Sequence, residues 1–332
     1  MGTVRKFVRT WIVGRMLLRN PVAFVAIWLV NRLRRGHRTA SEVPLSTLRA
    51  RGRVGADFLD RRGLVDENAP QPTGEIDDLD AFARSNAEPS DRGSDGSDGS
   101  DGAGDGFDPA AVDDRVREFC EHTAAYRLVY RVRWGRGFRL GARLASRLTS
   151  RIEQLNLPGT DVGWRRLHSR FVAVDLPDDT RDGVRGWVRT ADCGDCVFLA
   201  LYGTYEHDPD EVDRGERFVN VAVPLPGCTL STVLRPRNVA RPDRGPFGRL
   251  AKRFGRGVGS EDVTGGGIEW TTAGGGHPGL YLRFPWVAFR LPVSQRFRVL
   301  PAGPDDSGQL HATHEMWLFG IRFLRIDYRM ER

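Results

Sequence analysis

The stretch from Gly267 to Met330 constrains the fold most, because its apolar patterning continues for some sixty residues with turn residues at regular intervals. Its segments are rich in β-branched and aromatic residues and are bounded by Gly, Pro, Asp or Ser. This pattern is typical of antiparallel strands joined by turns. The predicted strands are 268–272, 279–284, 286–291, 295–300, 309–319 and 321–330.

Five further segments upstream also alternate with a period of two, and few helical patterns separate them. They are 169–175, 183–190, 196–206, 216–223 and 228–235. Ten or eleven strands in this arrangement predict an antiparallel β-barrel or β-sandwich over residues 159–332, with a basic loop at 236–267. The fold class is therefore α+β, with N-terminal amphipathic helices and an acidic disordered linker preceding the mainly antiparallel β domain.

The N-terminal block, residues 1–55, is basic and apolar. From Met1 to Arg53 there are twelve Lys and Arg residues against the single acid Glu42, a net charge of +11. The apolar run 21–30 is too short to cross a bilayer, which needs about 20 residues. We expect amphipathic helices at a membrane surface, with core helices packed on the β domain as the alternative. The predicted membrane contacts are Trp11, Arg15, Arg19 and Trp28.

Residues 56–108 are strongly acidic, with a Gly-Ser-Asp repeat at 93–102. Such a composition buries too little apolar surface to offset the entropy of ordering the chain. We therefore predict a disordered linker over 56–108.

Basic amphipathic helices are expected over residues 109–158. Asp108 and Pro109 resemble a helix start, which predicts a helix through about Arg133. A second helix over 138–155 carries leucines on one face and an arginine at every fourth position: Arg139, Arg143, Arg147 and Arg151. Two interpretations stay open for it, docking on the β domain with solvated arginines or contact with a membrane or phosphate.

The basic loop contains a short amphipathic element, in which Phe247, Leu250 and Phe254 follow helical spacing. Flanking glycines suggest a movable lip over the β domain. We predict membrane contacts at Phe247, Leu250, Lys252 and Phe254.

No sequence motif assigns catalytic residues, a cofactor or a metal. Cys193 and Cys196 have metal or redox spacing, but a second such pair is absent and a hairpin turn is the better interpretation. His311 and His314 are three apart on a predicted strand, so they point to opposite faces and do not chelate one ion.

One candidate polar cluster arises across two predicted strands, where Glu315, Arg325 and Asp327 share a face. A carboxylate pair beside an arginine suits acid–base chemistry. Cross-strand ion pairs on a solvated sheet face are the commoner outcome.

Three cationic apolar elements, residues 4–35, 138–155 and 247–256, favour a protein at an anionic membrane surface. Its β domain would bind an apolar small molecule or lipid, or dock a partner, without catalysis. The alternatives are an enzyme with a β-barrel active site of unspecified reaction and a nucleic-acid-binding protein. A pI near 9.7 suits nucleic acid, but no recognition motif accompanies it, so nucleic acid is disfavoured as a partner.

Four cysteines and the lack of a cleavable secretory signal predict reduced thiols. The expected location is therefore cytoplasmic, peripheral on the inner face of the cell membrane.

Overall fold

A computed structural model describes residues 37, 40–83, 106–206, 216–240, 266–274, 276–302 and 309–332. Its helical elements are α3 (Phe58–Arg61), η1 (Asp80–Phe82), η2 (Pro109–Ala111), α4 (Asp114–Glu121), η3 (Thr123–Ala125), η4 (Arg136–Phe138) and α5 (Arg139–Ile152). Its strands are β1 (Arg127–Trp134), β2 (Arg165–Ala173), β3 (Asp182–Thr190), β4 (Cys196–Glu206), β5 (Arg217–Leu225), β6 (Cys228–Val239), β7 (Gly267–Thr271), β8 (Gly279–Arg283), β9 (Ala288–Arg290), β10 (Val293–Pro301), β11 (Gln309–Leu318) and β12 (Ile321–Glu331).

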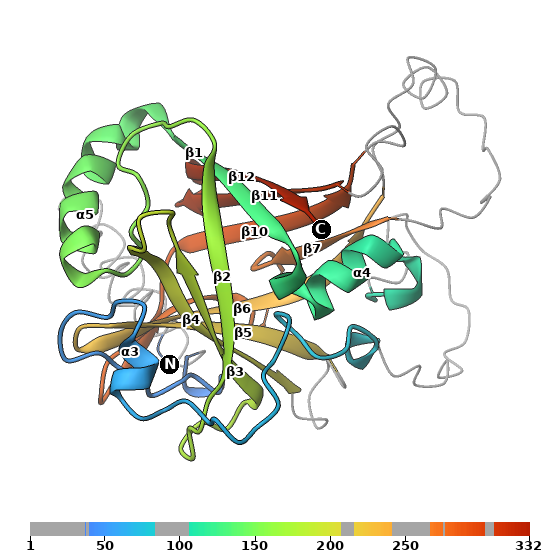
Figure 1. The fold of residues 1–332 in the computed structure, drawn as a ribbon, viewed down its shortest axis with the longest axis horizontal. Helices are drawn as coiled ribbons and strands as arrows, with labels where there is room; N and C mark the ends of the chain where they lie inside the picture. The colour runs from blue at the N-terminus through green and yellow to red at the C-terminus, as the bar shows by residue number, and fades with distance from the viewer. Residues whose placement is uncertain are drawn as a thin grey trace, which may run out of the picture.

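Ten of these strands close into an antiparallel barrel (Figure 1). The order is β5-β4-β3-β2-β1-β12-β11-β10-β7-β6, and pairing of β6 with β5 completes the ring. β8 and β9 extend from the first half of β6. The predicted β-barrel is confirmed, and the sandwich alternative is excluded by this closure.

Alternation along each strand sorts side chains between the two faces of the barrel wall. On β12, Leu324, Ile326 and Tyr328 belong to the interior cluster, whereas Arg325 and Asp327 form ion pairs on the outside. The period of two in the sequence therefore indicates which side chains face the interior of the barrel and which face outward.

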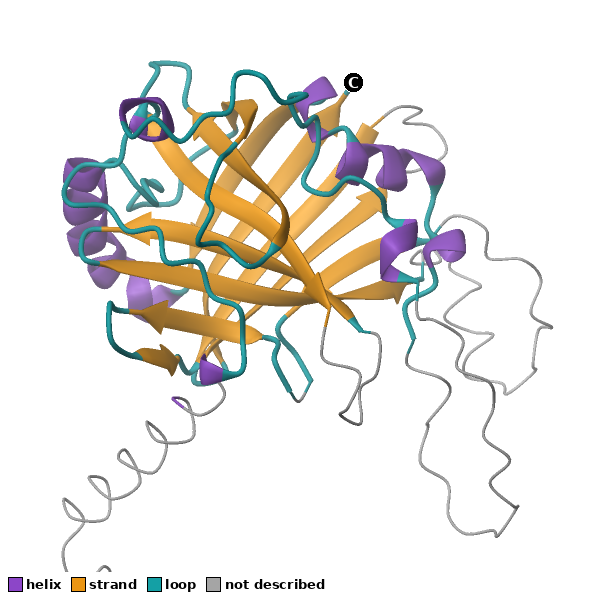
Figure 2. Cartoon of the chain, turned by 90° about the horizontal axis from the view of Figure 1, so that it is seen from below, coloured by secondary structure: helices purple, strands orange, loops and turns teal. Residues whose placement is uncertain are grey.

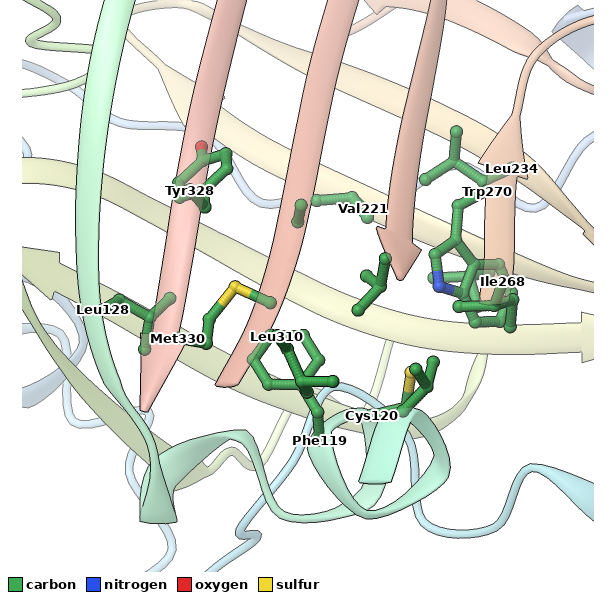
Figure 3. Packing of buried hydrophobic residues seen from close by; sticks show 14 of the residues in the cluster. Phe119, Cys120, Leu128, Val221, Leu234, Ile268, Trp270, Leu310, Tyr328 and Met330 are labelled. Atoms are coloured by element: carbon green, nitrogen blue, oxygen red, sulfur yellow. The ribbon is translucent and has the colours of Figure 1, made fainter. Parts of the chain in front are cut away.

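One end of the barrel is closed by α4 and the segment before it. Phe119 and Cys120 of α4 are buried against the interior cluster, which includes Leu310 and Met330 (Figure 3). Beside them the ring of Phe82 meets Trp270 edge-on, with centroids 5.4 Å apart. Apolar side chains therefore fill this end, which we call the α4 end.

At the opposite end lies α5, which connects β1 to β2 (Figures 1 and 2). Only Ala142 of this helix is buried. The chain after it is anchored by Gln154, whose side-chain amide donates to Leu199 O (2.8 Å) and Pro224 O (3.2 Å) and accepts from Leu199 N (2.9 Å). We call this end the α5 end.

The helix predicted from Asp108 through about Arg133 is wrong beyond Glu121, because residues 127–134 form β1. Leu128, Tyr130 and Val132 are buried, while Arg131 and Arg133 point outward to Asp327. The period of two in this stretch was mistaken for a continuation of the helix. The later helix predicted over 138–155 corresponds to α5.

The linker predicted over 56–108 is not disordered at its start, because residues 56–83 pack on the barrel. Phe58 and Leu59 are buried against the outer side of β4, which contributes Leu199 and Leu201. Apolar residues spaced between the acids supply this packing. Residues 84–105 lie outside the described part of the chain, as do residues 1–36 of the predicted N-terminal helices.

The basic loop predicted at 236–267 is shorter than expected, since β6 continues to Val239 and pairs with β7. Residues 241–265 lie outside the described part. None of the helices that the structure describes is long and apolar enough to cross a membrane.

Candidate ligand-binding site inside the barrel

The barrel encloses a cavity of about 160 Å³. Apolar side chains from nine strands and from the chain after α5 form most of its wall, among them Leu155, Leu157, Leu167, Val197, Phe198, Val219, Val221, Val223, Leu230, Leu234, Trp270, Leu280, Phe297, Met316, Leu324 and Ile326. An engineered apolar cavity of about 150 Å³ is large enough to bind benzene. This cavity therefore accommodates a small ring or a short alkyl segment, and a longer molecule has to extend through an open end.

The open end is the α5 end. Leu155, Leu157, Phe198, Leu230 and Met316 line the cavity near that end and are partly exposed. At the α4 end the lining residues Ile76 and Trp270 are buried. Access to the cavity is thus from the side on which α5 lies.

Polar side chains from several chain segments also line this mostly apolar cavity, and five of them matter for its charge and hydrogen bonding: Glu75 before η1, Arg189 on β3, Gln295 on β10, His314 on β11 and Tyr328 on β12. The guanidinium of Arg189 lies 3.5 Å from the ring centroid of Trp187 and 5.8 Å from that of Tyr328. No carboxylate of the described residues lies within 4 Å of this guanidinium, and its Nε is buried without a hydrogen-bond partner.

Glu75 places a carboxyl group in the same interior. Burial raises the pKa of Glu75 to about 7, and the nearby charge of Arg189 only partly opposes that rise. A carboxyl group with this pKa changes its charge near neutral pH. The charge of the cavity therefore depends on pH in the physiological range.

His314 is the opposite case, a base that the interior keeps neutral. Burial, with a further contribution from the charge of Arg189, lowers the pKa of His314 to about 4. Its Nε2 hydrogen-bonds Gln295 Oε1 at 3.4 Å, and its ring meets Phe297 edge-on at 5.9 Å. At neutral pH Arg189 is the permanent charge among these five groups.

The local sequence of β3 explains how an arginine comes to face inward. Trp187 and Arg189 point into the barrel, while Gly186 and Val188 face the segment around Leu59 on the outside. A Cβ at Gly186 would lie 2.4 Å from Leu59 Cδ1 and 2.8 Å from Val172 Cγ2, so the missing side chain of Gly186 lets that segment pack closely on β3. Both faces of β3 are therefore covered.

The candidate cluster Glu315, Arg325 and Asp327 is brought together, but on the outer wall. Arg325 lies 3.5 Å from Glu315 and 2.8 Å from Asp327. Burial alone would raise the pKa of Glu315, but hydrogen bonds from Arg296 and Arg322 and the adjacent charges lower it. This cluster is a ladder of ion pairs between strands and does not line the cavity.

The eight predicted membrane contacts, Trp11, Arg15, Arg19, Trp28, Phe247, Leu250, Lys252 and Phe254, lie outside the described residues. Cys193 is exposed at the turn between β3 and β4, and Cys196 is buried at the start of β4. Across the described ranges, no three His, Cys, Asp or Glu side chains are grouped so that they could hold a metal ion.

Sequence reasoning missed Glu75, Arg189 and His314 as a group. They are separated by more than a hundred residues from one to the next, and no motif links them. One signal was present: Trp187 and Arg189 share a face of the predicted strand 183–190, and an aromatic face is more often the inner one.

Comparison with known proteins gives one informative likeness. The chain is 27% identical over 283 residues to the "Uncharacterized membrane protein YndJ" of Bacillus subtilis (strain 168). The match covers 85% of this chain and 42% of the relative, so the chain spans less than half of that protein's length. No family model matches the chain. No solved structure matches it either.

Proposed function

We propose that the protein works at the cytoplasmic surface of a membrane and binds an apolar small molecule or lipid in its barrel without chemically changing it. One observation carries the proposal: the cavity opens at the barrel end where the structure exposes a row of apolar side chains beside arginines. The likeness to a membrane protein supports the membrane part of the proposal.

The apolar row belongs to α5. Leu140, Leu144 and Leu148 are 73%, 67% and 62% exposed, and their spacing of four residues aligns them along the helix. The opposite face of the helix, with Ala142 and Ser146, faces the barrel. The apolar face of this amphipathic helix therefore points away from the protein.

The tip of the β11–β12 hairpin extends the same surface. Phe319 and Ile321 are each 63% exposed. The hairpin reaches the start of α5, because Phe323 O accepts from Gly135 N (2.9 Å) and the rings of Phe323 and Phe138 are 5.8 Å apart. We call Leu140, Leu144, Leu148, Phe319 and Ile321 the docking patch. Exposed apolar patches of this kind mark interaction sites.

Charge favours an anionic bilayer as the occupant of the docking patch. Four arginines, Arg139, Arg143, Arg147 and Arg151, lie along α5 without an acid among them. A second copy of the chain is a poor occupant, because it would bring two rows of arginines together and they repel each other. Residues 1–36 are repelled by the arginines of α5 as well, because they carry eight Lys and Arg and no acid. Residues 84–105 are acidic but have only alanine and proline as apolar residues.

The first test uses sedimentation of the whole protein with vesicles of phosphatidylcholine and phosphatidylglycerol. Replacing Leu140, Leu144 and Leu148 by serine should weaken binding at least tenfold, since burying one leucine contributes about 1.5–3 kcal/mol. Vesicles of phosphatidylcholine alone should bind weakly to both proteins. Unchanged binding of the triple variant to the mixed vesicles would remove α5 from the membrane contact.

Two charge-reversal variants, one at each end of the barrel, form a matched pair. Arg147 on α5 and Arg127 at the α4 end are both exposed, and neither lies within ion-pairing distance of a described carboxylate. Arg147→Glu should weaken binding several-fold, because each basic residue near anionic lipid contributes about 1 kcal/mol. Arg127→Glu should bind as the unmodified protein does. Equal losses would mean that net charge, not the docking patch, governs binding.

Residues 1–36 and 241–265 stay proposed membrane contacts, so a second measurement has to report on α5 alone. A polarity-sensitive dye at Leu144→Cys, in a Cys193→Ser, Cys228→Ser background, should shift to the blue on anionic vesicles. The same dye at Arg127→Cys is the control. A dye at position 144 that does not respond while the protein sediments would place the contact elsewhere.

The ligand part is tested by native mass spectrometry with decanol, an uncharged amphiphile. The protein should hold one decanol. Val223→Phe, which adds a ring where Val223 lines the cavity, should hold none. Equal occupancy in both proteins would show that decanol binds outside the barrel.

Catalysis is the second candidate, and one observation favours it. The pKa of about 7 at Glu75 lies where a carboxyl group exchanges protons at neutral pH. Among the residues that line the cavity in the described part, however, none is a serine or cysteine nucleophile. Recovery of chemically altered ligand from the unmodified protein, and of intact ligand from Glu75→Gln, would favour an enzyme.

A further inference from the structure

We infer that the cavity ligand carries a single anionic group, a carboxylate or similar oxyanion, which pairs with Arg189 inside the barrel while its apolar part extends toward the α5 end. This inference rests on the proposed ligand binding and adds the chemical class of the ligand.

The first argument is the position of the charge. An arginine enclosed by apolar walls normally pairs with a carboxylate, because an unpaired buried charge is unfavourable. Elsewhere in this protein the buried Arg181 follows that rule, with Asp179 at 2.8 Å. Arg189 does not, since the described carboxylates all lie beyond 4 Å from it. Part of the guanidinium hydrogen-bonds the Tyr328 hydroxyl, and its Nε, which lacks a partner, is available to a ligand oxyanion.

A hydrogen-bond donor beside Arg189 also lacks an acceptor. Ser169 lies directly opposite Arg189 in the β2–β3 register, so both side chains project to the same face of the sheet. Its Oγ is buried without a partner, as is Nε of Arg189. A buried guanidinium Nε without an acceptor suits an oxygen-rich ligand group.

The remaining titratable groups of the cavity leave the site positive or neutral. Tyr130, Tyr202 and Tyr328 face it, and burial raises the pKa of each, so they stay uncharged at neutral pH. His314 is neutral for the reason given above. Glu75 is then the one group whose negative charge opposes an anion.

Because of Glu75, we expect the affinity for an anionic ligand to depend on pH. Below pH 7 its carboxyl group is protonated, and the cavity carries the charge of Arg189 alone. An anionic ligand should therefore bind more tightly at pH 6 than at pH 8. A ligand carboxylate with an ordinary pKa of about 4–5 is ionised at both pH values, so this difference reports on Glu75. The binding of an uncharged ligand should not change with pH.

The experiment compares decanoate, decanol and decylamine, which share one chain length, by titration calorimetry with the whole protein. Decanoate should bind on the order of ten times more tightly than decanol, and decylamine more weakly than either, because only decanoate forms a hydrogen-bonded ion pair with Arg189. Acetate, which lacks the chain, should not bind detectably.

Three variants test which residues cause the preference for decanoate over decanol. Arg189→Met should reduce decanoate binding to that of decanol and leave decanol binding unchanged, which also shows that the barrel is intact. Arg189→Lys should keep most of the preference. Glu75→Gln should bind decanoate equally well at pH 6 and pH 8.

The outcomes separate this inference from the proposed function. Decanol binding without a preference for decanoate, or a preference that survives in Arg189→Met, overturns the anionic ligand and leaves apolar binding in place. Failure of all three probes to bind overturns both. A preference for decylamine would assign the ligand charge to Glu75 and contradict the role of Arg189.

Discussion

The two ends of the barrel use the same kinds of residue in opposite ways. At the α4 end, an eight-residue helix buries Val116, Phe119 and Cys120 and fills the interior. At the α5 end, a fourteen-residue helix buries only Ala142 and turns its leucines outward. Both helices are amphipathic, so amphipathicity alone does not tell which face meets the protein.

The difference between the ends separates the part of the barrel that contributes stability from the part where we propose binding. The α4 end contributes buried apolar surface, which holds the ring of strands together. The α5 end has a cavity and a nearly unburied helix, which is followed by the buried anchor Gln154. Three pairs of substitutions test this division, from the largest expected effect to the smallest.

Phe119→Ala should produce the largest loss of stability. The Phe119 ring is 1% exposed and meets Tyr126 edge-on at 5.3 Å, so its removal should lower the free energy of unfolding by about 3–5 kcal/mol. Leu144→Ala at the α5 end is the control and should change it by less than about 0.5 kcal/mol. Urea denaturation measures both. Similar losses at the two positions would abolish the distinction.

Glu75→Gln should alter how stability depends on pH. Because the native pKa is raised from 4.5 to about 7, the folded protein holds this proton longer than the unfolded chain, and stability falls as pH rises through that window. Between pH 5 and pH 8 the unmodified protein should lose about 2–3 kcal/mol more than Glu75→Gln. The exposed Glu67→Gln should keep the slope of the unmodified protein. Parallel curves for the unmodified protein and Glu75→Gln would mean that Glu75 is solvated.

Val299→Phe and Val223→Phe place one added ring in the filled and in the hollow part of the barrel. Val299 is 0% exposed and lies away from the cavity, so overpacking there should cost about 1–3 kcal/mol. Val223 lines the cavity, and its variant should change stability by less than about 1 kcal/mol. Thermal unfolding compares the two. A larger loss at Val223 would mean that the cavity does not accept a ring.

Most strands were predictable because a barrel wall has two different faces, and alternation in the sequence records them. β1 was not predicted, because its residues follow a predicted helix start and contain three arginines, so they were assigned to the continuation of that helix. The packed part of the acidic segment was missed for a different reason. Composition averages over a window, whereas packing depends on single residues such as Leu59 and Leu79, which are both 0% exposed.

The cavity could not be predicted because its polar groups come from segments that meet only on closure of the ring. An arginine on a strand is ordinarily assigned to the solvent side, and Arg325 on β12 obeys that rule while Arg189 on β3 does not. The difference lies in residues 40–65, which cover the outside of β3 to β6 and make both faces of β3 buried. That covering is a tertiary feature with no local signature.

Closure of the ring also bears on how such a chain avoids aggregation. Unpaired sheet edges recruit other strands, and a closed barrel has none. In the part of the chain that the structure describes, the exposed edge is β9, which is three residues long and lies between Pro285 and Pro292. His37 donates a hydrogen bond to Ala288 O at 3.1 Å and satisfies one acceptor of that edge. A sheet of twelve strands thus offers other chains hardly any backbone to pair with.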